Sequence, residues 1–253
     1  MSQSDQFNGR LGLIFASIGA AIGTGNIWRF PRMVGANGGG TFLIPWLIFL
    51  FAWSIPLVIA EYAMGKRSRT GTIGTFRIFA GRRFAWMGLW TAWISTAIVF
   101  YYAVVSGWTL KYFQLGITGA LSGEKVDTTE VWNAFLQSPG QVIFFQFVVI
   151  LLVLGTIWKG AKAIEKVNFY LMISLFALLF LTLFLSLWMD LSDGSLDGAL
   201  FMFTVDFDML LEPEVWINGL SQSAWSCSAG MGMCITYAVY MSKDEDTVLN
   251  AFT

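Results

Sequence analysis

Residues 20–31 read AAIGTGNIWRFP and lie inside a segment, residues 11–34, that is apolar enough to cross a bilayer. The same stretch disfavours a continuous helix, because two glycines flank a threonine and an asparagine, an arginine and a proline follow. In lipid, every backbone N–H and C=O needs an internal partner, so unwound backbone persists only where protein or a polar cavity replaces the lost partners. The stretch therefore predicts a broken membrane helix with something to bind at the break.

The composition identifies the bilayer as the main solvent of this chain. Of its 253 residues, 56% are hydrophobic and 12% are charged, about half the charged share of a soluble domain. The net charge of −1 gives no field that would attract nucleic acid. There is no histidine, and Cys227 and Cys234 form no Cys-x-x-Cys pair, so neither zinc chemistry nor a disulfide scaffold is expected.

Six stretches are long and apolar enough to span a hydrocarbon core of about 30 Å as helices. They lie near residues 11–34, 41–65, 85–113, 141–158, 167–189 and 215–241. We therefore expect an all-α polytopic membrane protein in which residues 1–253 form a single transmembrane domain.

The basic residues predict the orientation of the spans. With a cytoplasmic N-terminus, the inner segments hold 11 of the 15 Lys and Arg residues: Arg10, Lys66, Arg67, Arg69, Arg77, Arg82, Arg83, Lys159, Lys162, Lys166 and Lys243. The outer connection over residues 190–214 carries seven Asp and Glu residues and no basic residue. This bias predicts a multi-pass protein of the plasma membrane with its N-terminus in the cytoplasm.

The last apolar span is interrupted like the first. Residues 225–232 read WSCSAGMG, so two serines and two glycines break an otherwise apolar helix. A break in mid-membrane leaves one helix N-terminus that favours a carboxylate and one C-terminus whose carbonyls favour a cation. Two such spans predict a binding site near the membrane midplane.

Simpler readings of these residues stay open. Glycines in membrane helices often serve close helix packing, and Gly19 and Gly230 taken singly fit that role equally well. A nucleotide loop is excluded, because residues 23–25 lack the third glycine, the preceding strand and the lysine of such loops. The Arg29 side chain could reach the outer interface. For Glu61, acceptance of hydrogen bonds from orphaned N–H groups of the broken helices is favoured over proton transport.

Several motifs in order resemble the neurotransmitter:sodium symporter family, whose bacterial members include the leucine transporter. They are GTGNIWRFP at 23–31, NGGGTFLIP at 37–45, EYAMG at 61–65, Tyr101-Tyr102, SGWTL at 106–110, ITYA at 235–238 and Lys243-Asp244. The resemblance implies a leucine-transporter-type fold, namely its first five-helix repeat plus the sixth span, with spans 1 and 6 discontinuous.

The resemblance also implies the site residues. One sodium ion would be bound by Ala21, Asn26 and Ser226, and a second by Gly19 and Ile22. The substrate carboxylate would meet the Gly25 amide and the Tyr102 hydroxyl, and its amine would meet oxygens of Ala21, Ser226 and Ser228. Met231 would face the substrate side chain, Trp225 would cover it, and Arg29 would be an extracellular gate charge. Glycine at position 23 favours a substrate that carries its own carboxylate.

The sequence also departs from the family pattern. Phe7 and Ser4 stand where the family usually has residues of the inner gate. Trp46 replaces a common tyrosine, which weakens the case for a chloride site. Ala163 and Ile173 stand where many relatives have a glycine and a proline, so a more continuous fifth helix is expected. The family fold adds five inverted spans, and that second repeat is absent from this chain. We expect it from the full-length chain or from another polypeptide.

These features together predict sodium-coupled symport of a neutral, hydrophobic amino acid by alternating access. Sodium ions are the only cofactors expected, and the partners are the amino-acid substrate and the lipid bilayer, with no nucleic acid. The alternative is a non-transporting membrane protein that binds a ligand or partner. An enzyme is not expected, because no nucleophile with an oriented base is recognisable.

Overall fold

The computed structural model describes residues 18–19, 25–122, 126–158, 160–193, 196–242 and 245–252, without the side chains of residues 161, 162 and 193. Every regular element in these ranges is helical. The elements are η2 (Gly25–Arg29), α2 (Phe30–Ala36), α3 (Gly40–Phe49), η3 (Leu50–Ser54), α4 (Ile55–Ser68), α5 (Thr72–Phe79), η4 (Arg82–Phe84), α6 (Ala85–Ile117), α7 (Thr128–Leu136), α8 (Pro139–Ile157), α9 (Ala161–Asp193), α10 (Asp197–Phe201), η5 (Met209–Leu211), α11 (Pro213–Cys227), α12 (Met233–Val239) and α13 (Thr247–Phe252).

Four continuous helical stretches are long and apolar enough to cross a membrane: Gly40–Ser68, Arg82–Ile117, Pro139–Ile157 and Ala163–Ser192. They correspond in position to the second, third, fourth and fifth spans expected from the sequence. The fifth helix, α9, runs unbroken past Ile173, and this confirms the prediction of a continuous helix there.

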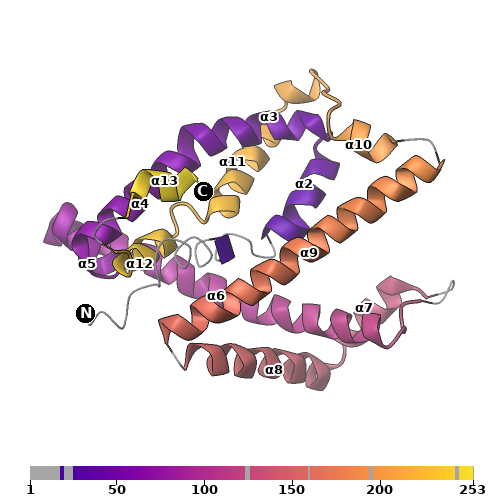
Figure 1. The fold of residues 1–253 in the computed structure, drawn as a ribbon, viewed down its shortest axis with the longest axis horizontal. Helices are drawn as coiled ribbons and strands as arrows, with labels where there is room; N and C mark the ends of the chain where they lie inside the picture. Colours follow the sequence, from indigo (N-terminus) through magenta and orange to yellow (C-terminus); the bar gives the residue numbers. More distant parts are fainter. Residues whose placement is uncertain are drawn as a thin grey trace.

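The sixth expected span is divided into α11 and α12, and the two halves lie along α3 and α4 (Figure 1). Glycines permit both contacts. A Cβ atom added to Gly219 of α11 would lie 3.0 Å from Pro45 Cβ on α3. A Cβ atom added to Gly65 of α4 would lie 2.8 Å from Ala238 Cβ on α12 and closer still to the Ile235 carbonyl oxygen. Spans 2 and 6 therefore pack as a pair along their whole length.

The outer end of span 2 packs against a loop that is distant in sequence. Gly39 has a φ of +60°, and a side chain there would collide with the backbone of Phe201. The Asp206 amide then donates a hydrogen bond to Thr41 Oγ1 over 2.8 Å. The glycine run at residues 38–40 thus lets the segment that follows α10 rest directly on the start of α3.

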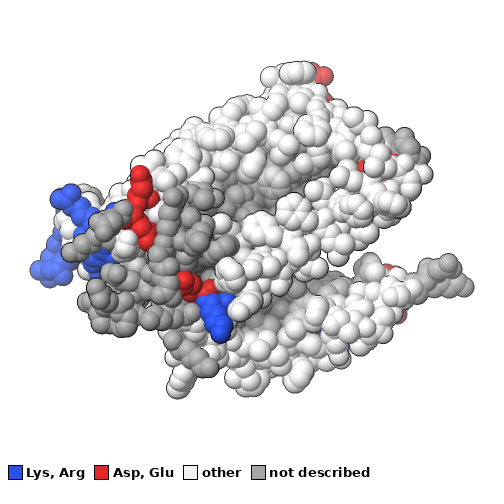
Figure 2. Space-filling view, in the orientation of Figure 1, with Lys and Arg blue, Asp and Glu red and all other residues white. Residues whose placement is uncertain are grey.

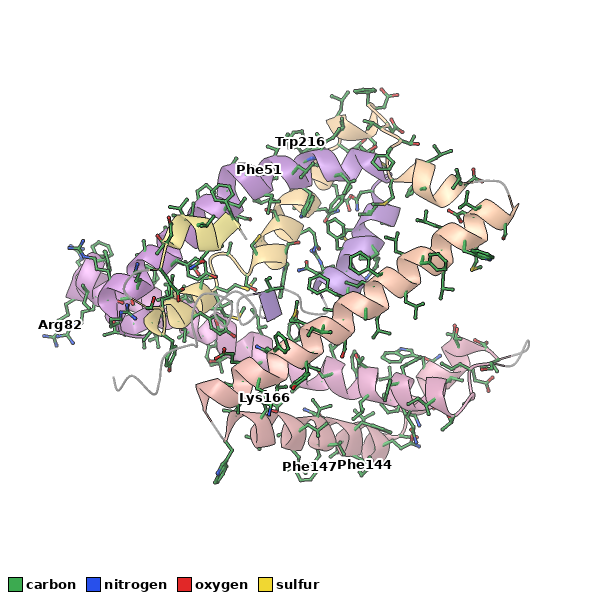
Figure 3. The ribbon with its side chains drawn as sticks, in the orientation of Figure 1. Phe51, Arg82, Phe144, Phe147, Lys166 and Trp216 are labelled. Carbon is green, nitrogen blue, oxygen red and sulfur yellow. The ribbon has the colours of Figure 1, made fainter. Side chains whose placement is uncertain are left out.

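Apolar side chains cover the long faces of the molecule, whereas charged side chains gather at its ends. Figure 2 shows Lys and Arg mainly over the end formed by α4 and α5, whereas most of the described long face in this view is uncharged. Phe144 and Phe147 project outward from α8 (Figure 3) with 59% and 55% of their surface exposed. Such exposure of large apolar side chains is expected where lipid replaces water as the solvent.

Candidate functional site

The gap in span 6 is built by three residues with left-handed backbone. Helix α11 ends at Cys227, and Ser228, Gly230 and Gly232 have φ values of +53°, +81° and +73°. Glycine adopts this conformation without strain, whereas serine does so rarely. Helix α12 starts again at Met233, so residues 228–232 cross from one half-helix to the other without regular backbone hydrogen bonds.

Glu61 on α4 compensates for part of this loss. Its Oε1 accepts hydrogen bonds from the backbone N–H groups of Gly230, over 3.0 Å, and Gly232, over 3.3 Å. The side chain is only 5% exposed, and its other oxygen, Oε2, has no hydrogen-bond partner among the described residues. The carboxylate therefore lies at the start of α12, where the positive end of the helix dipole also favours it.

Ser95 of α6 supports the same gap from the other side. Its hydroxyl donates to the carbonyl oxygen of Met231 over 2.6 Å, and this orients one of the peptide groups in the gap. Ser54 and Ser223 add a fully buried hydroxyl pair, Oγ to Oγ 2.5 Å apart, that joins η3 to α11 just outside the gap.

Span 1 meets the gap through η2. Asn26 Nδ2 donates to the carbonyl oxygen of Ser226 over 3.2 Å, so two residues expected at one sodium site lie together. Gln222 Nε2 lies 3.4 Å from the Gly25 carbonyl oxygen and 3.3 Å from Ser226 Oγ. The buried Gln222 side chain thus connects the end of α11 to the turn that begins at Gly25.

Arg29 is held by the same helix. Its guanidinium donates to Gln222 Oε1 over 2.5 Å and to Ser221 Oγ over 3.1 Å. The charge expected at the outer gate is therefore bound to α11 instead of extending to the interface, although the side chain stays half-buried.

A cavity of about 480 Å³ opens beside η2, α6 and the end of α11. Its described wall consists of Gly25, Trp28, Arg29, Trp90, Trp93, Ile94, Ala97, Ile98, Tyr101, Tyr102 and Trp225. A Cβ atom added to Gly25 would lie 3.9 Å from the Tyr102 hydroxyl, so the amide and the phenol expected to meet a carboxylate are neighbours. The wall is largely aromatic, and Arg29 is its one charged residue among those described.

The other residues expected at the site fall into three groups. Ser226, Ser228 and Met231 lie at or within the gap of span 6, outside the described cavity wall. Gly19 lies against α9, where a Cβ atom would be 3.2 Å from Asn168 Nδ2. Ala21 and Ile22, with the expected break of span 1, fall outside the described residues, as do Ser4 and Phe7.

Comparison with known proteins identifies the family. The model of the sodium:neurotransmitter symporter family matches residues 4–138 and 136–253 of the chain. The chain belongs to the sodium:neurotransmitter symporter family. This membership confirms the resemblance found in the sequence motifs, and the family is one of secondary transporters, not of enzymes.

Relatives within the symporter family agree with this assignment. The chain is 31% identical over 95% of its length to the uncharacterized sodium-dependent transporter YhdH of Bacillus subtilis, and covers 53% of that protein. It is 29% identical over 97% of its length to the mouse sodium-dependent neutral amino acid transporter B(0)AT2, and covers 38% of it. The chain thus spans about half the length, or less, of these two relatives.

A solved structure confirms the leucine-transporter-type fold. The crystal structure of MhsT in complex with L-phenylalanine matches 98% of this chain and 56% of its own, with a TM-score of 0.86 and 33% sequence identity. The chain therefore has the fold that the motifs predicted.

Three groups that build the site were not singled out from the sequence: Gln222, Ser95 and the Ser54–Ser223 pair. The closest signal was for Gln222, a buried amide in the apolar sixth span only four residues before Ser226. A polar side chain at membrane depth generally faces a partner or a cavity, so its position already indicated a role.

Proposed function

We propose that the protein acts in sodium-coupled symport of a neutral, hydrophobic amino acid. The observation that carries the proposal is the cavity, which combines the Gly25 turn and the Tyr102 hydroxyl with a wall of tryptophan and isoleucine side chains. An aromatic wall favours an apolar side chain, and the helix break nearby favours a zwitterion. No carboxylate lies among the described wall residues, which supports a substrate with its own carboxylate.

Two similar proteins support the same substrate class. One is a neutral amino acid transporter, and the other was crystallised with L-phenylalanine. The cavity volume of about 480 Å³ is within the range of small-molecule sites and leaves room for an aromatic amino acid.

Sodium is the co-substrate in this proposal. Hard oxygen donors suit an alkali cation. The Asn26 side-chain amide donates a hydrogen bond to the Ser226 carbonyl oxygen, so one ion could bind between the amide oxygen of Asn26 and oxygen atoms at the end of α11. Ala21 would complete this site, and Gly19 and Ile22 would contribute to a second one. Substrate amine contacts are proposed for Ala21, Ser226 and Ser228.

Alternating access would use the gap in span 6 as a joint. The regular helix of span 6 is interrupted at residues 228–232, and span 2 has the π-helical turn η3 between the parts that pack on α11 and on α12. The outer and inner halves of the pair could therefore tilt relative to each other at this level. Trp225 would cover the substrate, Met231 would approach its side chain, and Arg29 would close the outer path. We further propose that the protein is in the plasma membrane, with its N-terminus in the cytoplasm, and that the remaining spans of the family fold complete both ion sites.

The test is binding of radiolabelled L-phenylalanine by the protein reconstituted in liposomes. Binding is expected in sodium chloride and lost when choline replaces sodium. Asn26→Leu should abolish the binding that requires sodium. Asn133→Leu, the same substitution at an exposed position on α7, should leave this binding intact. Equal binding in sodium and choline would refute the proposal.

The alternative is a membrane protein that binds a ligand in the same cavity without completing a transport cycle. The same liposomes separate the two functions. Uptake against a concentration gradient on addition of external sodium supports symport, whereas sodium-dependent binding without accumulation supports a membrane binding protein.

A further inference from the structure

The connection between spans 2 and 3 lies where two membrane-crossing helices emerge from the bilayer. One crossing helix ends at Ser68 and the next begins at Arg82, so α5 and the turns beside it occupy the membrane surface. A Cβ atom added to Gly88 of α6 would lie 2.5 Å from the Thr72 carbonyl oxygen. Glycine at this position therefore lets α5 lie directly against the start of α6.

This connection is strongly basic. Residues 66–83 contain six Lys and Arg residues, and no Asp or Glu occurs between Glu61 and Glu124. Two of the six bond to carbonyl groups of this chain, since Lys66 donates to Glu245 over 2.5 Å and Arg69 donates to Val239 and Met241. The side chains of the other four are exposed, and none of these side chains makes a hydrogen bond or ion pair within the described part of the chain. They are Arg67, Arg77, Arg82 and Arg83.

The two acidic side chains that the structure describes between α12 and α13 form hydrogen bonds within their own segment. Asp246 Oδ1 accepts hydrogen bonds from the amides of Val248 and Leu249, and Glu245 Oε2 accepts one from Asn250. These carboxylates thus cap and brace the start of α13. Figure 2 shows the resulting excess of Lys and Arg at this end of the molecule.

Apolar side chains accompany the free arginines. Helix α5 buries Thr72 and Thr75 and exposes Ile73 and Ile78, which are 45% and 58% accessible. Three nearby aromatic side chains are also exposed: Phe79 at the end of α5, and Phe84 and Trp86 at the start of the next crossing helix. A surface that combines exposed arginines with isoleucine and aromatic side chains is typical of helices that lie at the boundary of headgroups and acyl chains.

We infer that this surface binds the phosphate headgroups of anionic phospholipids in the leaflet at that end of the molecule. We call it the inner basic surface and define it by Arg67, Arg77, Arg82 and Arg83. The apolar side chains would enter the acyl boundary, and the guanidinium groups would donate paired hydrogen bonds to phosphate oxygens. A lipid is favoured over a protein partner because the surface begins and ends at residues from which membrane-crossing helices extend.

Lipid bound there would hold the inner half of spans 2 and 6 at the membrane surface. Arg69 directly follows α4 and donates to the carbonyl groups of Val239, the last residue of α12, and of Met241. The connection that carries the inner basic surface is therefore hydrogen-bonded to α12 as well as continuous with α4. This role goes beyond the proposed transport function and does not depend on which substrate is carried.

The test measures selectivity for spin-labelled phosphatidylglycerol over spin-labelled phosphatidylcholine at the surface of the protein in liposomes. One basic residue near an anionic leaflet contributes about 1 kcal/mol, which corresponds to roughly five-fold in association. Arg82→Gln with Arg83→Gln should therefore lower the selectivity at least five-fold. The control, Lys166→Gln, removes one charge at the start of α9, distant from Arg82 in Figure 3 and outside the inner basic surface. It should lower the selectivity less than the double variant does, by at most about five-fold.

Two further measurements keep the inference open to refutation if the double variant fails to insert. Arg77→Gln should lower the selectivity alone, and raising the salt concentration should weaken the wild-type selectivity, because exposed charges are screened. Equal association of the two lipids with the wild-type protein would overturn the inference and leave the arginines as topology signals only. Displacement of phosphatidylglycerol by an equal concentration of inorganic phosphate would also overturn it, because the surface would then be a soluble-anion site.

Discussion

At the scale of single residues, the broken sixth span depends on Glu61. The gap leaves peptide N–H groups without helical partners, and two of them, on Gly230 and Gly232, bond to one oxygen of this buried carboxylate. An isolated charge at membrane depth would be expensive, so the acid and the gap each offset the cost of the other. The acceptor role could be predicted from the sequence because a lone acid in an apolar span needs donors, and a glycine-rich gap in another span supplies them.

Replacement of Glu61 should therefore destabilise the fold. Glu61→Leu leaves two buried N–H groups unpaired, at a cost of about 1–3 kcal/mol each. Glu61→Gln keeps one acceptor oxygen and should lose less. Thermal unfolding in detergent measures both effects, with the exposed Glu130→Leu on α7 as the control. Equal midpoints for Glu61→Leu and the control would show that the hydrogen bonds to the gap contribute nothing.

Gln222 illustrates what local patterns cannot predict. It bonds to Arg29 across 193 positions of sequence, and the partner becomes evident only when η2 and α11 lie side by side. The composition of either span gives no sign of this pairing, although the polar type of each residue does indicate that it needs one.

Loss of the Gln222 amide should weaken substrate binding. Gln222→Leu has a similar volume but leaves Arg29 and the Gly25 carbonyl without this partner. A hydrogen bond to a charged group contributes about 1.5–3 kcal/mol, so the Kd for L-phenylalanine should rise about ten-fold or more. Gln141→Leu, at an exposed position on α8, is the matched control in the same binding assay. An unchanged Kd for Gln222→Leu would exclude a role of this amide in shaping the site.

At the scale of elements, the serines and glycines of residues 225–232 predicted the gap, whereas the sequence did not predict the two π-helical turns. Both turns precede a proline by the same distance: η2 ends at Arg29 before Pro31, and η3 ends at Ser54 before Pro56. Proline lacks an N–H and clashes with the carbonyl four residues earlier, so a wider turn relieves the helix just before it. Proline in a membrane helix predicts a distortion, but its form depends on how neighbouring helices satisfy the freed groups.

The pairing of half-helices makes a prediction for glycine in α4. Gly65→Ala places a methyl group against Ala238 and the Ile235 carbonyl, and such overpacking costs about 1–3 kcal/mol. Gly155→Ala in α8 meets no atom within 4 Å and should be neutral or stabilising, by up to about 1 kcal/mol. Unfolding midpoints of the two variants test the contact. A Gly65→Ala protein as stable as Gly155→Ala would mean that α4 and α12 do not pack this closely.

At the scale of the whole molecule, the sequence predicted the positions of four apolar spans along the chain better than the packing of the helices against one another. Apolar length alone locates Pro139–Ile157, because a bilayer requires that length whatever the neighbours are. The pairing of α11 with α3 and of α12 with α4 could not be predicted in the same way. It depends on small residues such as Gly219 and Gly65 meeting backbone on another span, and a single sequence does not reveal which surfaces meet.

Charge asymmetry extends over the whole molecule, and it leads to a prediction about orientation. The segments proposed to be inside hold 11 of the 15 basic residues, whereas residues 190–214 hold none. Exposed positions at opposite ends, Ala80 after α5 and Ser122 after α6, can each be replaced by cysteine. A membrane-impermeant maleimide applied to intact cells should label Ser122→Cys but not Ala80→Cys, and permeabilisation should expose Ala80→Cys. The unmodified chain, with Cys227 half-buried and Cys234 buried, gives the background. Because basic residues resist transfer across the membrane during insertion, labelling of Ala80→Cys in intact cells would reverse the proposed orientation and place the inner basic surface on the outer leaflet.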